Sequence, residues 1–143
     1  VGLEPCVIPA LGHSNFKIED GTMEFGVGHH GEAGTKVEKL KSASEMAQEM
    51  AETILNDFDF EEGKEVAVML SSLGATPVME LYVLYDEVEK VLAKAGHKVW
   101  KTYIGNYVTS LDMNGASLTI VDLDDEIKEL LSEPAVPIGM KNY

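Results

Sequence analysis

The chain of 143 residues contains no arginine: all eleven basic residues are lysines, against 25 aspartates and glutamates. Arginine supplies the planar fork that binds phosphate through two parallel hydrogen bonds, and the chain also has no GxxxxGK[ST] phosphate loop. A net charge of −14 leaves no basic face for a nucleic-acid backbone. We therefore expect no nucleic-acid partner, and we expect any nucleotide that the protein uses to be held by another subunit or domain.

Cysteine and long apolar runs are also scarce. Cys6 is the single cysteine, so no internal disulfide can form, and a reducing compartment is expected. Cys6 is favoured as a small buried hydrophobic residue over a nucleophile. A membrane helix needs roughly 18–20 apolar residues in succession, which no segment supplies, and no signal-peptide pattern opens the chain. The expected location is cytoplasmic, without membrane contact.

The length is typical of one domain with a hydrophobic core. The sequence begins with Val1 rather than methionine, and its first twelve residues show neither a helix start nor a strand pattern. This beginning raises the expectation that the chain is a piece of a longer protein.

The first half of the chain predicts a hairpin and a helix. Two short, partly alternating runs, 15–19 and 23–27, flank Asp20-Gly21, a pair typical of hairpin turns. Residues 42–58 carry apolar side chains at helical spacing, and Ser42 is followed after three residues by Glu45, as in a capping box. The methionines of this segment are interpreted as core residues.

The second half predicts a strand–helix–strand unit and a further strand. The apolar run 66–70 is typical of a central buried strand. Thr76 is placed as N-cap and Pro77 as first residue of a helix that ends at Gly96, and a strand follows from Val99. Residues 116–123 predict another strand, and Asp124 can cap a last helix that runs through Leu131. The expected fold class is α/β, with a mixed sheet covered by helices.

Three polar segments are candidate sites with a structural alternative each. Gly74 and the helix start after it could bind an anion through backbone N–H groups, although a simple strand-to-helix turn is favoured. The acidic run 122–126 could hold a divalent cation, although capping and helix-dipole effects explain it without a metal. The stretch 105–115, GNYVTSLDMNG, either lines a pocket or only turns the chain.

The segment GVGHHGEAG, residues 26–34, is the fourth candidate. Its glycines permit positive φ angles and a close approach of the backbone to a ligand. His29 and His30 point to opposite sides of an extended segment, so at most one faces a given pocket. Their spacing does not match a metal site, but a neutral imidazole can act as a base or attack a carbonyl carbon. The alternative is an exposed glycine-rich turn.

Three stretches together resemble one known family. Residues 23–34 (MEFGVGHHGEAG), 73–82 (LGATPVMELY) and 105–120 (GNYVTSLDMNGASLTI) are similar to the C-terminal domain of DhaK, the substrate-binding subunit of dihydroxyacetone (glycerone) kinase. CVIPA near the start is similar to the entry segment of that domain. The resemblance covers nearly the whole chain in the same order, so residues 1–143 are expected to be this domain without the N-terminal sugar-binding domain.

The resemblance implies a function and a site residue. In the family, the histidine of an HGE motif bonds through its imidazole to the carbonyl carbon of dihydroxyacetone as a hemiaminal, and the motif assigns this role to His30. The resemblance further implies a homodimer and a kinase of glycerol metabolism. The phosphoryl group comes from a separate DhaL-type subunit or domain, which carries ADP within the phosphotransferase system or binds ATP, with Mg²⁺. No cofactor and no metal are expected in this chain, which alone is expected to be inactive.

Two positions depart from the family pattern, and two other functions stay open. His29 stands where the family usually has an aliphatic residue, and Ala33 replaces the usual proline. A second imidazole beside His30 could change the ketose preference. The open alternatives are a kinase subunit for a related ketose such as erythrulose, and a non-catalytic paralogue that senses a ketose and regulates other proteins.

Overall fold

The computed structural model describes residues 1–14, 16–28, 33–61 and 63–140. Its elements along the chain are β1 (Thr22–Phe25), β2 (Lys36–Lys39), α1 (Ala43–Asp57), β3 (Glu65–Ser72), α2 (Val78–Lys94), β4 (Lys98–Gly105), β5 (Ala116–Asp122) and α3 (Asp125–Ser132). Within these described ranges, no helix has both the length and the apolar character needed to cross a membrane.

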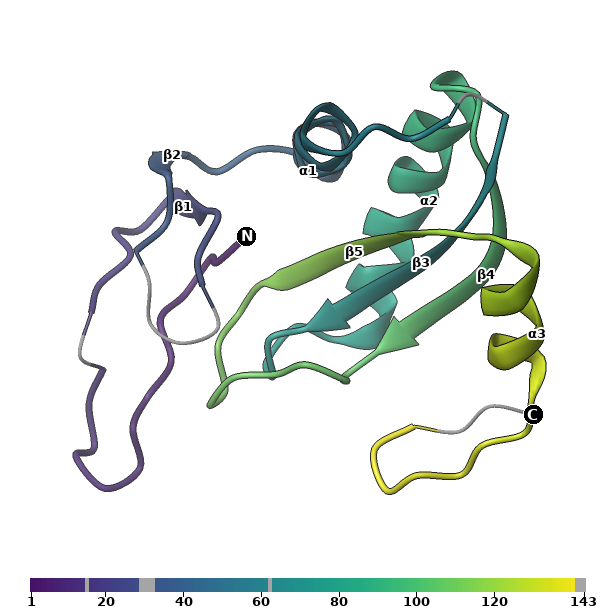
Figure 1. The fold of residues 1–143 in the computed structure, drawn as a ribbon. Coiled ribbons are helices and arrows are strands. Elements are labelled where there is room, and N and C mark those ends of the chain that lie inside the picture. The colour runs from purple at the N-terminus through teal and green to yellow at the C-terminus, as the bar shows by residue number, and fades with distance from the viewer. Residues whose placement is uncertain (15, 29–32, 62, 141–143) are drawn as a thin grey trace.

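A three-stranded sheet, in the order β4-β3-β5, forms the centre of the fold (Figure 1). β3 runs parallel to β4 and antiparallel to β5, and α2 makes the crossover between the parallel pair. The expected α/β class, the mixed sheet and the strand–helix–strand unit are therefore confirmed. β3 is the central strand of this sheet, as its apolar run 66–70 predicted.

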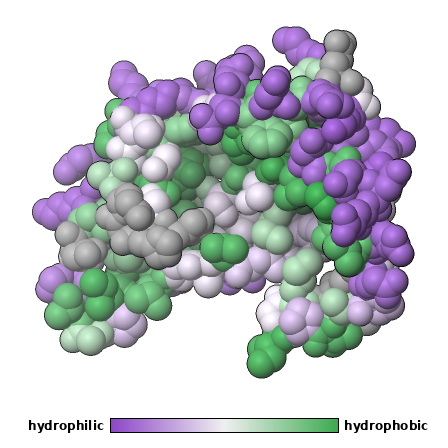
Figure 2. Space-filling view, in the orientation of Figure 1, coloured by the Kyte–Doolittle hydropathy of each residue, from purple (hydrophilic) through white to green (hydrophobic). Residues whose placement is uncertain are grey.

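The core lies between this sheet and the two long helices. Val66, Val68 and Leu70 of β3 are fully buried and belong to one cluster with Leu81 and Leu92 of α2. α1 packs mainly on α2 and adds the buried Ala47, Met50 and Ala51. Side chains in a strand alternate between faces, so the neighbours of these β3 residues point to the opposite face. That face is turned to the viewer in Figure 2, where it has intermediate hydropathy.

The helix ends agree with the sequence except at one position. Ser42 caps α1 in a complete capping box with Glu45, and the Asp124 carboxylate accepts the N–H of Ile127 at the start of α3. The N-cap of α2 is Pro77, not Thr76 as predicted, and it has no side-chain cap. The prediction was wrong because the Thr76 hydroxyl has tertiary partners, described below, in place of the helix N–H groups.

The hairpin also differs from the prediction. The turn at Asp20-Gly21 exists, with Gly21 at φ 73° and the Thr22 N–H bonded to the Glu19 carbonyl. However, residues 16–19 form no strand, and β1 pairs antiparallel with β2 instead. The hairpin forms a two-stranded sheet of its own. Four-residue alternation is a weak signal, and long-range pairing overrode it.

Candidate functional site

The glycine-rich segment 26–34 is the connection between the two strands of the hairpin, so it directly follows β1 as expected. Gly26 adopts φ 76°, a conformation that favours glycine. The N–H of Gly34 donates to Glu24 Oε1 at 2.6 Å, and the N–H of Thr35 donates to the Phe25 carbonyl at 2.7 Å. The far end of the loop is thus fastened to β1.

Gly34 is required by space and not by its backbone angle. A Cβ at this position would lie 2.6 Å from the carbonyl oxygen of Phe25, which is closer than real Cβ contacts come. Gly34 is thus needed for packing within the loop base, and the predicted close approach of the backbone to a ligand stays a prediction. The predicted site residue His30 and its neighbour His29 lie outside the described residues, as does Glu32.

Residues 1–3 join the hairpin to the central sheet. Gly2 exchanges two backbone hydrogen bonds with Glu24, at 2.8 and 2.9 Å. Val1 and Ala116 are paired in both directions, and the Leu3 N–H donates to the Asn114 carbonyl at 2.7 Å. The segment therefore acts as a short strand between β1 and the start of β5.

The loop 105–115 is tied to the loop that follows β3. The buried Ser71 hydroxyl accepts the N–H groups of Tyr107 and Val108, both at 3.0 Å, and the Ser110 N–H donates to the Leu73 carbonyl. Ser71 stands at the carboxyl end of the central strand, where it faces the end of β4. The first part of the 105–115 loop is thus fixed on the central strand.

Thr76 fixes the other end of this loop. Its Oγ1 accepts the N–H of Gly115 at 2.8 Å and lies 2.7 Å from the carbonyl oxygen of Gly115 and 2.9 Å from Asn114 Oδ1, which compete for its proton. Gly74 has φ 126°, and a Cβ there would meet the Ser110 carbonyl at 3.0 Å. The loops 71–76 and 105–115 therefore form one rigid unit at the edge that faces the hairpin.

Two N–H groups of the predicted anion site bond to the protein's own groups. The Gly74 N–H donates to Ser72 Oγ at 3.0 Å, and the Ala75 N–H donates to the Met113 carbonyl at 3.1 Å. Neither N–H is available to a ligand, and Pro77 has none. The turn interpretation is therefore favoured.

The acidic run 122–126 has structural roles. Asp124 caps α3, and Asp122 lies 3.5 Å from Lys64 Nζ. In the part of the chain that the structure describes, no group of three His, Cys, Asp or Glu side chains is arranged to hold a metal ion. Asp125 and Glu126 lie in the first turn of α3, where negative charge complements the helix dipole.

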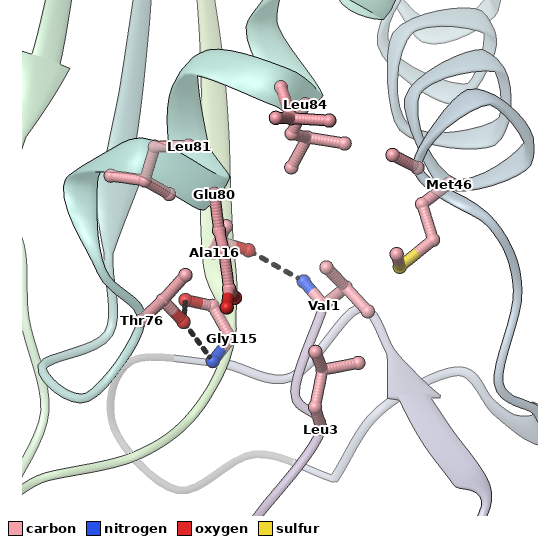
Figure 3. A pocket seen from close by; sticks show the side chains of 11 residues that line it. Val1, Leu3, Met46, Thr76, Glu80, Leu81, Leu84, Gly115 and Ala116 are labelled. Carbon is pink, nitrogen blue, oxygen red and sulfur yellow. Dashed lines mark hydrogen bonds between the residues drawn. The ribbon is translucent and has the colours of Figure 1, made fainter.

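A pocket lies among residues 1–3, α1, α2 and the start of β5 (Figure 3). It has a volume of about 210 Å³ and is mostly apolar, lined by Val1, Leu3, Ala43, Met46, Thr76, Glu80, Leu81, Val83, Leu84, Gly115 and Ala116. Val1 and Leu3 point into it, whereas a Cβ on Gly2 would point to Val27 at the start of the histidine loop. The pocket and the root of this loop thus lie on opposite sides of one strand-like segment.

Comparison with known proteins assigns the chain to a family. The model of the Dak1 domain matches residues 1–138. The chain belongs to the Dak1 domain family. A relative from Listeria innocua, the dihydroxyacetone-binding subunit DhaK of PTS-dependent dihydroxyacetone kinase 1, is 42% identical over 88% of this Dak1 domain and 38% of its own length. A D-erythrulose kinase from Mycolicibacterium smegmatis is 36% identical over 94% of this chain and 23% of its own length.

Two solved structures share the fold. The dihydroxyacetone kinase operon co-activator Dha-DhaQ matches 93% of this Dak1 domain with a TM-score of 0.85 and 29% identity, over 42% of its own chain. The dihydroxyacetone kinase from C. freundii, solved in complex with AMP-PNP and Mg²⁺, matches 92% of this chain with a TM-score of 0.77 and 27% identity, over 24% of its own chain. The Dak1 domain thus spans well under half the length of these relatives.

The contacts that join the loops 71–76 and 105–115 of this Dak1 domain were not predicted from the sequence. Thr76 and Ser71 looked like ordinary turn residues, and Gly2 stood in a segment without a pattern. The available signal was weak, because Met113 shares the mostly polar run 109–114 with a second apolar residue, Leu111. Met113 is only 3% exposed, so it anchors its loop in the interior.

Proposed function

We propose that this Dak1 domain is the substrate-anchoring, C-terminal part of a dihydroxyacetone kinase subunit and that His30 is the anchor. The observation that carries the proposal is the 42% identity to a dihydroxyacetone-binding subunit across 88% of the chain. The HGE motif at residues 30–32, in the loop between β1 and β2, supplies the nucleophile. The fastened loop base described above supports this role, because a covalent anchor needs a defined position.

The proposed chemistry is a reversible addition. The lone pair of an unprotonated imidazole nitrogen of His30 attacks the C2 carbonyl carbon of dihydroxyacetone, and the carbonyl π electrons move to the oxygen. The oxygen takes up a proton, and the imidazole loses the proton of its other nitrogen, which gives a neutral hemiaminal. The small substrate is then held in one pose while a terminal hydroxyl receives the phosphoryl group. Glycerol, which has no carbonyl, is excluded.

The phosphoryl donor is proposed to lie on a partner. Nucleotide phosphates with Mg²⁺ call for basic forks and carboxylate ligands. This chain has no arginine, and its described residues contain no cluster of three potential metal ligands. The relative solved with AMP-PNP and Mg²⁺ is a longer chain, which is consistent with a nucleotide site beyond the Dak1 domain. We propose a DhaL-type donor subunit or domain, an N-terminal sugar-binding domain and a homodimer for the complete subunit.

Two relatives favour second candidates. The D-erythrulose kinase suggests a four-carbon ketose as substrate, and the co-activator structure suggests a regulator that binds a ketose without phosphorylating it. Phosphorylation assays with the full-length protein and its donor subunit separate these functions. A preference for erythrulose in direct competition would make erythrulose the favoured substrate. Equal turnover would mean that the protein does not distinguish the two ketoses. Capture without turnover would identify a regulator.

The test of the anchor is a carbon NMR spectrum with dihydroxyacetone labelled at C2. We expect the ketone signal to be joined by a protein-bound signal of a tetrahedral carbon, which His30→Ala abolishes and His29→Ala preserves. The matched pair controls for the loss of an imidazole from this loop. Loss of the bound signal in His29→Ala alone would show that His29, and not His30, is the anchor. Its absence from the unmodified full-length protein would contradict the proposed function.

A further inference from the structure

β5 lies at one side of the three-stranded sheet and pairs with β3 alone in the sheet order. We propose that the other edge of β5, residues 117–122, binds the segment that immediately precedes Val1 in the complete subunit, as an antiparallel strand. The proposal rests on the proposed function in one respect, since it takes the chain to be the C-terminal part of a longer subunit. The geometry that carries it belongs to described residues.

The first residues of the chain already run along the start of β5 (Figure 1). The amino group of Val1 donates to the carbonyl of Ala116 at 2.8 Å, and the N–H of Ala116 donates back to the carbonyl of Val1 at 2.9 Å. Gly2 lies opposite Gly115 in an antiparallel bridge. These contacts fix a single register between the two segments.

The same register extends along the whole of β5. It places the residue before Val1 opposite Ser117, and earlier residues opposite the rest of the strand. In an antiparallel pair, hydrogen-bonded and non-hydrogen-bonded positions alternate. Because Val1 and Ala116 exchange both bonds, Leu118 and Ile120 turn their backbone N–H and C=O groups toward the same edge. This edge is therefore in line to bond the preceding segment.

β5 also lacks the side chains that commonly protect a strand edge. Unpaired edges tend to bind other strands, and proteins guard them with lysine or proline. The outer strands β2 and β4 carry two lysines each, whereas β5, ASLTIVD, has neither lysine nor proline. Leu118 and Ile120 pack against the buried core cluster, so the edge is held in a fixed position. An edge of this composition is suited to a permanent partner strand.

The preceding segment fits this edge better than a strand of a second copy. A second copy could pair only up to the point where Val1 meets Ala116, and the residues before Val1 would have to turn away from the sheet at once. A continued strand needs no turn. A complete subunit as long as the relative from Listeria innocua has ample chain for it, because the match covers 38% of that protein.

The proposed strand would join the two sheets of the domain into one. Gly2 already bonds to Glu24 of β1 on the side that faces away from β5. With the preceding segment on β5, the order of strands becomes β2, β1, the segment, β5, β3 and β4. The chain that enters the Dak1 domain would then be a central strand of a continuous mixed sheet.

The experiment is NMR spectroscopy of the full-length subunit. Residues at non-hydrogen-bonded antiparallel positions bring their Hα atoms close together. We expect one Hα–Hα NOE between the residue immediately before Val1 and Ser117, and another between the third residue before Val1 and Thr119. These two contacts together report the register as well as the presence of the strand.

Hydrogen exchange provides the matched control. The N–H of Val37 points to the outer edge of β2, because Glu24, its partner in β1, exchanges both backbone bonds with Gly2. We expect the amides of Leu118 and Ile120 to exchange at least about a hundredfold more slowly than that of Val37.

Three results would overturn the proposal. Exchange at Leu118 and Ile120 as fast as at Val37 would show a free edge. Protection that is lost on dilution, with NOEs between differently labelled copies, would assign the edge to a second copy. Protection without either set of NOEs would assign it to another segment. Capture of C2-labelled dihydroxyacetone by the same sample tests the proposed function separately, because neither the NOEs nor the exchange rates require the ketose.

Discussion

The helix–sheet region, residues 43–132, and the N-terminal region, residues 1–40, are stabilised in different ways. Every member of the buried core cluster except Phe25 comes from the helix–sheet region. The N-terminal region has two four-residue strands and exposes Val7, Leu11, Val37 and Leu40. The start of the N-terminal region, purple in Figure 1, lies at the lower left, where the surface in Figure 2 is largely hydrophobic.

The helix–sheet region supplies most of the buried core, whereas the N-terminal region carries the proposed anchor. The N-terminal region is attached through backbone pairs such as Gly2 with Glu24, and through an ion-pair network in which Glu49 of α1 accepts from Lys36 and Lys41. Hydrogen bonds and surface ion pairs contribute less than burial. Binding loops are commonly drawn from such less stable parts of a protein. The histidine loop belongs to this region.

The largest expected effect is a core deletion in the helix–sheet region. Leu81→Ala removes a fully buried side chain and is expected to lower the free energy of unfolding by about 2–5 kcal/mol. Val37→Ala in β2, where the side chain is 64% exposed, is expected to change it by less than about 0.5 kcal/mol. Urea unfolding curves measure both. Comparable losses would refute the division between the two regions.

The second effect concerns the platform that joins the regions. Thr76→Val keeps the shape of the side chain but leaves the Gly115 N–H without its acceptor, at an expected cost of about 1–3 kcal/mol. Thr53→Val is the control, because the Thr53 hydroxyl bonds only to the Glu49 carbonyl on an exposed helix face. Hydrogen exchange should show faster exchange at Gly115 in the first variant alone. Unchanged exchange there would argue against this attachment.

The third effect compares two helix caps. Ser42→Ala removes the cap of α1 and is expected to cost about 1 kcal/mol of global stability. Asp124→Ala removes an equivalent cap from α3, but none of the eight residues of this helix, all of them described, is buried. We expect a smaller change in global unfolding and faster local exchange in α3. Equal changes in the urea midpoint would show that α3 is part of the cooperative unit.

The smallest effect concerns the ion pairs between the regions. Burial acts to raise the pKa of Glu49, but hydrogen bonds from Lys36 and Lys41 outweigh it and hold this pKa below its ordinary value of 4.5. A carboxylate with a lowered pKa stabilises the fold above its ordinary pKa, and this contribution is lost as the pH falls through the folded-state pKa. Glu49→Gln is expected to cost about 0.2–1 kcal/mol at pH 7 and nothing at strongly acidic pH.

The control for this charge effect is Glu52→Gln on the same helix, where the carboxylate accepts from Gln48. Unfolding curves at several pH values, at low and high salt, provide the measurement. The cost of Glu49→Gln should shrink with added salt, since screening weakens exposed pairs. A cost that is independent of both pH and salt would mean that Glu49 contributes through packing rather than charge.

The elements with strong local signals were predicted correctly. The capping box at Ser42, the apolar spacing of α1 and α2, and the two-sided apolar run of β3 each depend on residues a few positions apart. The N-terminal pairing was not predictable in the same way. β1 pairs with β2 across a ten-residue loop, and a four-residue strand carries too little periodicity to identify its partner.

The candidate site likewise has one part that local sequence predicts and another that depends on long-range contacts. The motif HGE and its family resemblance pointed to His30, which stays a prediction because residues 29–32 are not described. The roles of Thr76 and Met113 could not be read from local sequence, because each depends on partners about 40 to 110 positions away. A threonine before a proline fits a helix cap equally well until its actual partners are known.

The sequence by itself determined the class of fold, the family and the chemistry that the histidine motif offers, since periodicity, composition and motifs are local properties. Only the tertiary structure decided which strand completes the hairpin and which hydroxyls fasten the loops. It also decided that the side chain of Met113 occupies the space beside Gly2. These outcomes depend on long-range pairing and on the filling of space, and close packing selects among arrangements that local signals leave equally favourable.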